Sequence, residues 1–290
     1  MNVKPWIEAM RLRTLPVSVA GVTTAVGYAV RDEAFEPVAA GLCLAFALLA
    51  QIASNFANEY FDYKAGRDRP GREGPRRGVT EGDISPRAMC RAAVLTLAVA
   101  CCLGLLLVAR GGWWLVAVGA AVAVGVFAYS TGPYPLSTKG WGEIAVIVFF
   151  GLVPVSLCYY VQALQWDWSV AAGSLAIGLL GANVLIVNNY RDIEDDRAVG
   201  KRTLAVRFGR MAMCVLYAVN ALVAMLLMGP CWDSLARLMW LIPTITAAAA
   251  GLIVREMSHH RGAALTPLLG ATAMLMFAYS LLFLLAAALT

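Results

Sequence analysis

Long apolar runs alternate with short polar segments from one end of the chain to the other. Nine of these runs, each of roughly 18 to 25 residues, are long enough to cross a bilayer as a helix. They lie at about 14–30, 37–61, 88–109, 112–130, 143–162, 168–190, 208–229, 235–254 and 264–289. The pattern predicts an all-α, polytopic membrane protein in which residues 1–290 form a single nine-helix transmembrane bundle.

The composition agrees with this pattern. Hydrophobic residues make up 60% of the 290 residues, charged residues only 14%, and the mean hydropathy is +0.71. A soluble domain of this size needs far more charge on its surface, whereas lipid-facing helices need almost none. A cleavable signal peptide is the alternative for the first run, which follows Arg11 and Arg13, but many further spans follow it and no clear A-x-A site ends it.

Basic residues test the orientation of the predicted spans. With a cytoplasmic N-terminus, twenty of the 23 Lys and Arg residues fall on the cytoplasmic face, and only Arg31, Arg110 and Arg237 fall on the other. Cytoplasmic loops of membrane proteins carry such an excess. The split predicts a cytoplasmic N-terminus and a C-terminus on the opposite face. It also accounts for the net charge of +5 without any nucleic-acid partner.

Cysteine, histidine and tryptophan add no chemistry. The seven cysteines show no C-x-x-C or metal-ligand spacing, and in or beside apolar runs they act as small hydrophobes. His259 and His260 are adjacent in a polar segment, so they lack the helical spacing of a metal pair. The eight tryptophans gather at predicted span ends, which is typical of interfacial anchors.

A pentapeptide of the form N-x-Y-x-D occurs twice, as NEYFD at 58–62 and NNYRD at 188–192. Each copy lies at the predicted cytoplasmic end of an apolar helix. Residues at i, i+4 and i+8 share a helix face, so Asn188, Asp192 and Asp196 line up. Polar residues one and two turns before the first copy, Asn55 and Gln51, are costly in lipid unless they face an interior cavity. The sequence therefore predicts a pocket that opens to the cytoplasm.

Juxtaposition of the two pentapeptides would gather several acids, namely Asp62, Asp68, Asp192 and Asp196. Carboxylates at close quarters repel unless a cation neutralises them, and Mg²⁺ prefers oxygen ligands shared with substrate phosphates. Basic residues follow both copies: Lys64, Arg67, Arg72, Arg76, Arg77, Lys201 and Arg202. Acids that hold a metal and bases that hold an anion favour a diphosphate site. The alternative is solvated juxtamembrane charge, which the duplication makes less attractive.

Four long segments resemble the UbiA superfamily of intramembrane prenyltransferases. They are WIEAMRLRTLPVSVAG, QIASNFANEYFDYKAGRD, YSTGPYPLSTKGWGE and NNYRDIEDDRAVGKRTLAVRFG, which together extend over most of the chain. They are most similar to the branch of menaquinone biosynthesis that acts on 1,4-dihydroxy-2-naphthoate. Two positions depart from the superfamily pattern. Glu59 stands where an aspartate is usual, and YPLSTK at 134–139 matches the Y-P-x-x-K of the hydroxybenzoate branch imperfectly.

The resemblance implies an Mg²⁺-dependent reaction in a bacterial cytoplasmic membrane. A polyprenyl group would pass from polyprenyl diphosphate to the naphthoate carbon that bears the carboxylate, releasing diphosphate and carbon dioxide and giving demethylmenaquinol. Membrane lipid is also an expected partner, and nucleic acid is not. Cytoplasmic loops at about 63–86, 131–142 and 191–209 would cap the site. The first is rich in glycine and is suited to exclude water.

The resemblance also implies site residues. Expected metal ligands are Asn58, Asp62, Asp68, Asn188, Asp192 and Asp196. Expected catalytic residues are Asp62, Asp192, Asp196 and Lys201. Expected substrate-binding residues are Lys64, Arg72, Tyr129, Tyr134, Lys139 and Arg202, with Arg11 or Arg13 for the aromatic carboxylate.

Two other functions stay open at this point. One is another aromatic prenyltransferase of the same superfamily, such as the 4-hydroxybenzoate enzyme, which would leave the carboxylate on its product. The other is a membrane transporter with an acidic cytoplasmic mouth. A transporter is expected to carry ionisable residues near the bilayer midplane, whereas the charges here lie at one face.

Overall fold

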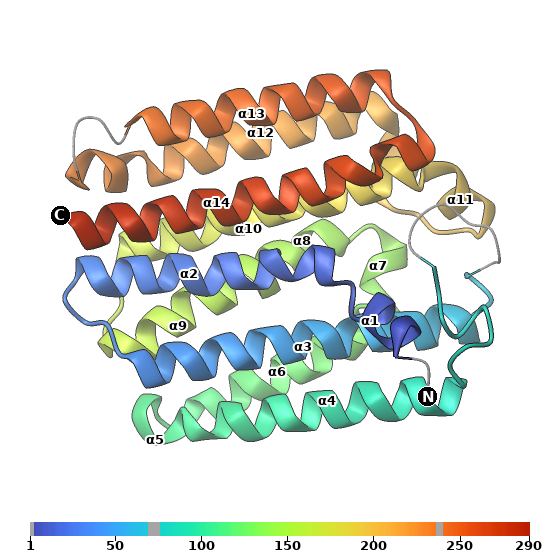
Figure 1. Ribbon diagram of the computed structural model, residues 1–290, viewed down its shortest axis with the longest axis horizontal. Helices are drawn as coiled ribbons and strands as arrows, with labels where there is room; N and C mark the ends of the chain where they lie inside the picture. The colour runs from blue at the N-terminus through green and yellow to red at the C-terminus, as the bar shows by residue number, and fades with distance from the viewer. Residues whose placement is uncertain (1–2, 69–75, 236–239) are drawn as a thin grey trace.

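The computed structural model describes residues 3–68, 76–235 and 240–290, and in these ranges every regular element is a helix (Figure 1). The helices that run the length of the molecule are α2 (Leu15–Arg31), α3 (Pro37–Lys64), α4 (Pro86–Leu106), α6 (Trp114–Ala128), α10 (Trp168–Arg191), α12 (Leu204–Leu235), α13 (Leu241–His259) and α14 (Thr266–Leu289), together with a continuous stretch of α8 (Gly142–Val146), η2 (Ile147–Leu152) and α9 (Val153–Ala163). Short helices join or precede them: α1 (Lys4–Met10), η1 (Leu12–Thr14), α5 (Val108–Gly111), α7 (Leu136–Lys139), α11 (Ile193–Ala198) and η4 (Gly262–Leu265).

The all-α membrane bundle predicted from the sequence is confirmed, although in the part of the chain that the structure describes fewer than the nine predicted spans are long and apolar enough to cross a membrane by themselves. In the described ranges, seven helices are long and apolar enough to cross a membrane. The runs predicted at 14–30 and 112–130 form α2 and α6, which have only 17 and 15 residues. α2 has the length of its predicted run and begins one residue later, after the 3₁₀ turn η1. α6 is shorter than its predicted run because the chain turns at Gly112, whose φ is 92°.

Helix starts follow local chemistry. Pro37 and Pro86 stand at the first positions of α3 and α4, where proline removes no needed hydrogen bond. The side chain of Ser85 accepts a hydrogen bond from Ala88 N at 3.3 Å, and that of Asp167 accepts one from Ser169 N at 2.6 Å. Such N-caps satisfy amides that the first helical turn leaves unpaired. The helices therefore begin where the sequence places these residues.

Close packing around α10 depends on small residues. A Cβ added at Gly151 would lie 2.3 Å from the Cα of Gly178, so the π-helical segment η2 and α10 touch through their backbones. Small residues allow such approach between helices in a membrane. The π-helical stretch ends just before Pro154, whose missing N–H disturbs the α-helical ladder. α10 is consequently held at the centre of the bundle, with its final turns directed toward the loop end.

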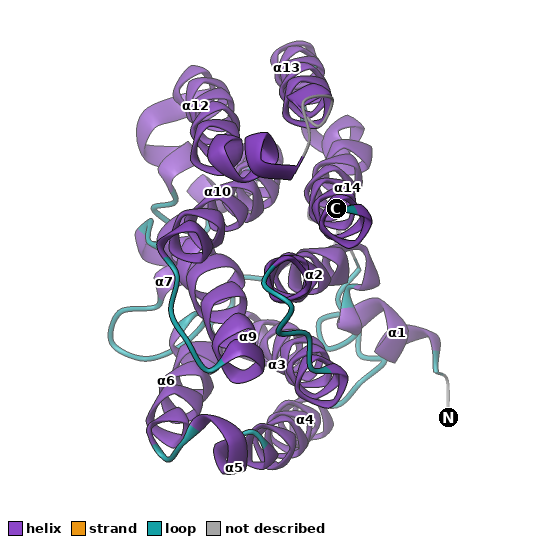
Figure 2. Ribbon diagram, turned by 90° about the vertical axis from the view of Figure 1, so that its left-hand side faces the viewer, coloured by secondary structure: helices purple, strands orange, loops and turns teal. Residues whose placement is uncertain are grey.

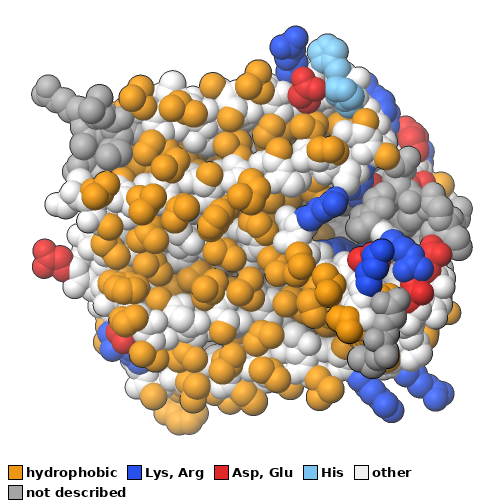
Figure 3. All heavy atoms as spheres, in the orientation of Figure 1, with side chains coloured by type: hydrophobic (Ala, Val, Ile, Leu, Met, Phe, Trp, Pro, Cys, Tyr) orange, Lys and Arg blue, Asp and Glu red, His pale blue; other side chains and the backbone are white. Residues whose placement is uncertain are grey.

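Charge is concentrated at one end of the bundle. On the face drawn in Figure 3, apolar side chains are spread along the length of the bundle, and Lys and Arg gather mainly at the end that carries the loops. At the other end, Arg31 pairs with Asp32 at 2.7 Å, and Arg110 donates to the carbonyl oxygens of Val161 and Gln162 at 2.6 and 2.8 Å. Arg237 lies outside the described residues. The two ends of the chain lie at opposite ends of the bundle (Figure 1).

Candidate active site

A cavity of about 910 Å³ lies inside the bundle, with residues of α2, α3, α6, α9 and α10 in its wall. The same helices are seen nearly end-on in Figure 2. Away from the loops its wall is apolar, with side chains such as Phe46, Val122 and Phe149. Toward the loops its wall carries Asn58, Asp62, Asn188, Asp192, Asp196 and Lys201. An apolar chamber with one charged mouth suits a ligand with an apolar tail and an anionic head.

The first pentapeptide occupies the last two turns of α3. Asn58 Nδ2 donates to Asp62 Oδ2 at 3.3 Å and to Ser130 Oγ at 3.1 Å, so the helix itself brings the amide and the carboxylate together. Arg67 Nη1 donates to Asp62 Oδ1 at 2.9 Å. Both Asn58 and Asp62 are buried. The buried carboxylate is thus neutralised on one oxygen by a guanidinium from the following loop.

The second pentapeptide ends α10 and has a parallel arrangement. Arg191 binds Asp192 through two hydrogen bonds, Nε to Oδ1 at 2.6 Å and Nη2 to Oδ2 at 2.9 Å. The same Nη2 donates to Asn188 Oδ1 at 2.9 Å. Bidentate pairs between arginine and a carboxylate fix geometry as well as charge. Asp192 and Asn188 are therefore held in place at the cavity mouth.

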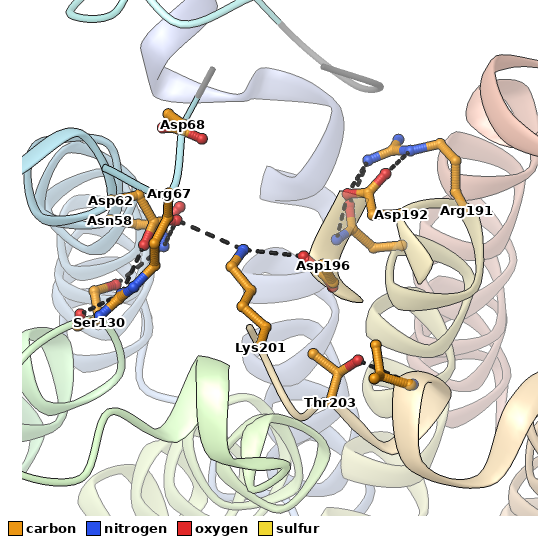
Figure 4. Close-up of polar contacts among 12 residues, drawn as sticks. Asn58, Asp62, Arg67, Asp68, Ser130, Arg191, Asp192, Asp196, Lys201 and Thr203 are labelled. Carbon is orange, nitrogen blue, oxygen red and sulfur yellow. Dashed lines mark hydrogen bonds and ion pairs between the residues drawn. The ribbon is translucent and has the colours of Figure 1, made fainter. Parts of the chain in front are cut away.

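Lys201 joins the two halves of the site. Its Nζ lies 3.1 Å from Asp196 Oδ1 and 3.9 Å from Asp62 Oδ2 (Figure 4). Asp62 comes from the first motif, and Asp196 lies one turn beyond the second. A single ammonium group thus spans residues that are far apart in the sequence. The sequence-based prediction that the two motifs face one pocket agrees with this arrangement.

The donor set suits a cation shared with a ligand and not one held by protein alone. In residues 3–68, 76–235 and 240–290, no three His, Cys, Asp or Glu side chains lie close enough to hold a metal ion. The mouth instead offers carboxylate and amide oxygens on two sides, each acid contacted by Arg67, Arg191 or Lys201. Mg²⁺ commonly takes one or two carboxylates and completes its shell with water and phosphate oxygens. These residues therefore fit a magnesium–diphosphate group.

Arg11 and Arg13 also line the cavity, as the sequence-based guess for a carboxylate site requires. Arg11 has a backbone φ of 54°, a left-handed conformation that is uncommon outside glycine. Its Nη2 donates to Asn58 Oδ1 at 2.5 Å. Strained backbone of this kind often marks a functional position. Arg11 also ends α1 as its C-cap, and its guanidinium lies at the polar mouth beside Asn58.

Tyr129, another predicted substrate-binding residue, also lines the cavity. The remaining predicted site residues that the structure describes do not line it, namely Lys64, Asp68, Tyr134, Lys139 and Arg202. Lys64 and Arg202 are exposed. Lys139 Nζ lies 5.9 Å from the centre of the Tyr134 ring in the loop outside the mouth. Asp68 is buried and contacts Arg77 (Oδ2 to Nε, 3.5 Å), whose Nη2 is 3.5 Å from Asn58 Oδ1. Arg72 lies outside the described residues.

Two positions inside the pentapeptides serve the fold. Glu59 is buried and accepts a hydrogen bond from Val79 N at 3.0 Å, so it anchors the loop that follows α3. Tyr190 is buried, and its hydroxyl accepts a hydrogen bond from Arg261 Nη1 at 2.8 Å. Arg210 and Arg261 both lie over its ring. These contacts place Glu59 and Tyr190 outside the group that faces the cavity.

Sequence reasoning missed Ser130 and Arg191 as site residues. Ser130 accepts a hydrogen bond from Asn58, and its carbonyl oxygen accepts one from Arg67 at 3.3 Å. Arg191 occupies a variable position of the second pentapeptide, NNYRD. Its place directly before Asp192 was the available signal, because a cation beside a buried acid neutralises it.

Comparisons with known proteins agree with the fold. The model of the UbiA prenyltransferase family matches residues 20–281. A 1,4-dihydroxy-2-naphthoate octaprenyltransferase of Mycobacterium tuberculosis is 41% identical over 73% of this chain and 72% of its own. One from Mycobacterium leprae is 37% identical over 95% of this chain and 93% of its own. A UbiA homolog from Archaeoglobus fulgidus, solved with DMAPP and Mg²⁺, superposes with a TM-score of 0.70 at 15% identity, covering 98% of this chain and 99% of its own, and so shares the fold.

The family match extends over most of the chain, and relatives above 30% identity match it over more than two thirds of their length. Together with the apolar helices, it establishes a multi-pass membrane enzyme of the prenyltransferase type. The chain belongs to the UbiA prenyltransferase family.

Proposed function

We propose that this protein is a magnesium-dependent 1,4-dihydroxy-2-naphthoate polyprenyltransferase of menaquinone biosynthesis. The prenyl C–O bond breaks, a C–C bond forms at the ring carbon bearing the carboxylate, and loss of that carboxylate as carbon dioxide returns the bond pair to the ring. Diphosphate and demethylmenaquinol are the other products. The observation that carries the proposal is the meeting of two N-x-Y-x-D motifs at the charged mouth of an otherwise apolar cavity. The names of the relatives supply the acceptor.

Four residues at the mouth would hold the magnesium ions, namely Asn58, Asp62, Asn188 and Asp192, with Asp196 beside them. Bound there, Mg²⁺ neutralises the charge that builds up on the diphosphate leaving group. Lys201 lies between the two motifs and adds a positive charge at the same place. Charge stabilisation of a leaving group by fixed cations is effective where water is excluded. We assign Lys201 and the two motifs to activation of the prenyl donor.

The apolar part of the cavity would hold the prenyl chain and protect the allylic cation that forms as the C–O bond breaks. Water would quench such a cation, and an apolar wall lowers the access of water. Arg11 and Arg13 line the cavity near Asn58 and would pair with the carboxylate of the aromatic acid. A cationic partner positions the acceptor ring before reaction.

We further propose that residues 1–290 work as one domain in a bacterial cytoplasmic membrane. The loop end of the bundle, with most Lys and Arg residues, would face the cytoplasm, and the C-terminus would lie on the other face. The loops at 131–142 and 191–209, and the described residues of the loop at 63–86, belong to that end. This orientation lets the soluble aromatic acid reach the mouth of the cavity.

The acceptor is tested with purified protein, a polyprenyl diphosphate and either 1,4-dihydroxy-2-naphthoate or 4-hydroxybenzoate. We expect turnover with the naphthoate only, one carbon dioxide released per product and no activity after chelation of Mg²⁺. The measurement is product mass together with evolved carbon dioxide. A naphthoate product that keeps its carboxylate, or turnover with hydroxybenzoate alone, would contradict the proposed function.

Gly119 of α6 provides a test of where the prenyl chain lies. It lines the cavity, and a Cβ added there would meet no atom within 4 Å. Gly119→Leu is expected to lower kcat/KM for the longest prenyl diphosphate by about 10-fold or more relative to geranyl diphosphate, because the side chain fills space that the tail needs. Steady-state kinetics with donors of increasing length measure this.

Gly41 is the matched control for that substitution. It also has nothing within 4 Å of an added Cβ, but it is exposed on α3 and does not line the cavity. Gly41→Leu should leave the preference for chain length unchanged. Equal loss with short and long donors in Gly119→Leu would argue against a prenyl tail at this wall.

A further inference from the structure

A buried acidic side chain, Glu143, forms a hydrogen bond with a residue of the cavity wall that has no part in the proposed donor site. Glu143 of α8 and Asn189 of α10 are both buried, with exposed fractions of 4% and 7%. Asn189 Nδ2 donates to Glu143 Oε1 at 2.9 Å. Asn189 lines the cavity beside Asn188, whereas Glu143 does not reach its surface. The pair therefore consists of an amide at the wall and an acid behind it.

The acid determines how the amide is oriented. The NH₂ group of Asn189 faces Glu143 Oε1, so the carbonyl oxygen at the other end of the same amide points away from Glu143. None of the residues that the structure describes donates to Asn189 Oδ1. That oxygen keeps some exposed surface, since it is not among the fully buried, unpartnered polar atoms of the described chain, and Asn189 is one of the residues that line the cavity. The cavity wall thus presents one oriented hydrogen-bond acceptor.

A neighbouring asparagine on the same helix shows what a purely structural amide looks like. Asn183 Nδ2 donates to the carbonyl oxygen of Tyr217 at 3.0 Å, and its Oδ1 accepts from Asn220 at 3.1 Å. Both ends of that amide are satisfied by protein groups, as is usual for buried polar groups. Asn189 differs in that only its donor end is satisfied. The acceptor end of Asn189 is therefore available to a hydrogen-bond donor in the cavity.

The energetics of Glu143 support the same conclusion. Apart from Asn189, no other residue of the described chain bonds its side chain, and Oε2 is buried without a partner. A buried acid with one amide partner costs stability, and an apolar residue would join α8 to α10 at lower cost. In a bundle that spans lipid, such residues usually serve function. Glu143 orients Asn189 through its hydrogen bond, which an apolar residue could not do.

We propose that Asn189 Oδ1 accepts a hydrogen bond from a ring hydroxyl of the dihydroxy aromatic acceptor, and that Glu143 is the positioning residue that orients it. The inference rests on the proposed function and deepens it. Asn189 follows Asn188 of the donor site directly, so a ring held by Asn189 lies beside the activated end of the prenyl diphosphate. A site that accepts a hydrogen bond selects for a hydroxyl, because its oxygen would otherwise be left unpaired.

The test compares kinetics of Asn189→Leu and Glu143→Gln with wild type. The acceptors are 1,4-dihydroxy-2-naphthoate and the two analogues that each lack one ring hydroxyl. We expect Asn189→Leu to raise KM for the dihydroxy acceptor by about 10-fold and to lose the discrimination against one analogue, since one hydrogen bond is removed. KM for the prenyl diphosphate should stay near the wild-type value. Glu143→Gln should show a smaller change in the same direction, because a glutamine amide can face Asn189 with either end.

Asn183→Leu is the matched control, because it removes a buried amide from the same helix away from the cavity. It is expected to lower the thermal unfolding temperature without changing the acceptor preference. If Asn189→Leu behaves like this control, the pair is structural and the inference is overturned. Unchanged KM and unchanged discrimination in a folded Asn189→Leu protein would overturn it as well.

Wild-type turnover separates the two proposals. A wild-type protein that prenylates the naphthoate while Asn189→Leu keeps full discrimination contradicts only the role of Asn189. A wild-type protein that prenylates a different hydroxylated ring contradicts the assigned acceptor. In that case, the wild type and Asn189→Leu are compared again with that ring and with its analogue that lacks the hydroxyl, and the result decides the role of Asn189.

Discussion

Asp62→Asn and Asp192→Asn are each expected to lower the rate of prenyl transfer by about 100-fold or more, because each removes a negative charge that we propose binds the magnesium–diphosphate group. The two acids lie at the cavity mouth on different helices, so neither should replace the other. Asparagine keeps the size of the side chain, and the variants should remain folded. The measurements are initial rates over a magnesium titration, and gel filtration and circular dichroism in detergent.

Glu194→Gln is the control for these substitutions. Glu194 belongs to α11 close to Asp192 and Asp196, but its side chain is exposed and pairs with Arg197 and Arg210. Its loss should leave the rate and the magnesium dependence within about two-fold of wild type, since exposed ion pairs contribute little. Full activity in folded Asp62→Asn or Asp192→Asn protein would remove these acids from the metal site.

Lys201→Met is expected to lower kcat by about 100-fold, because the ammonium group is positioned to stabilise the charge on the departing diphosphate. Lys201 contacts Asp62 and Asp196 from the two halves of the site and lines the cavity. Methionine keeps much of the apolar stem and removes only the charge. Single-turnover rates with prenyl diphosphate and Mg²⁺ in excess would separate this effect from weaker donor binding.

Lys64→Met tests whether proximity to the motif is sufficient. Lys64 follows the first pentapeptide in sequence but is exposed and lies away from the cavity wall. We expect its activity to stay close to wild type. A large loss in Lys64→Met, with none in Lys201→Met, would show that the loop after α3 rearranges around the substrate and that our assignment of the cation is wrong.

The hydropathy pattern predicted the class of fold well because lipid leaves the chain few choices. In the membrane every backbone polar group must be satisfied within its own helix, so a long apolar run becomes a helix. The hydropathy pattern did not predict the length of every helix correctly. The run at 112–130 yields a helix of only 15 residues, since apolar composition continues through Trp113 and Gly112 although the backbone there turns.

The candidate site was predictable where it depends on helical register. Asn58 with Asp62, and Asn188 with Asp192, share a helix face, and each pair is joined by a hydrogen bond. Register says nothing about contacts between segments, so the sequence assigned a role at the site to both Lys64 and Lys201. The structure separates them, because only Lys201 reaches both motifs.

By itself, the sequence determined that the chain forms apolar helices with two matching acidic motifs at their ends, since hydropathy and helical periodicity are local properties. The tertiary structure decided which cation contacts which acid, that Glu59 anchors a loop, and that Glu143 orients Asn189 at the cavity wall. Those contacts join residues from different helices, and their partners are set by how the helices pack around the cavity.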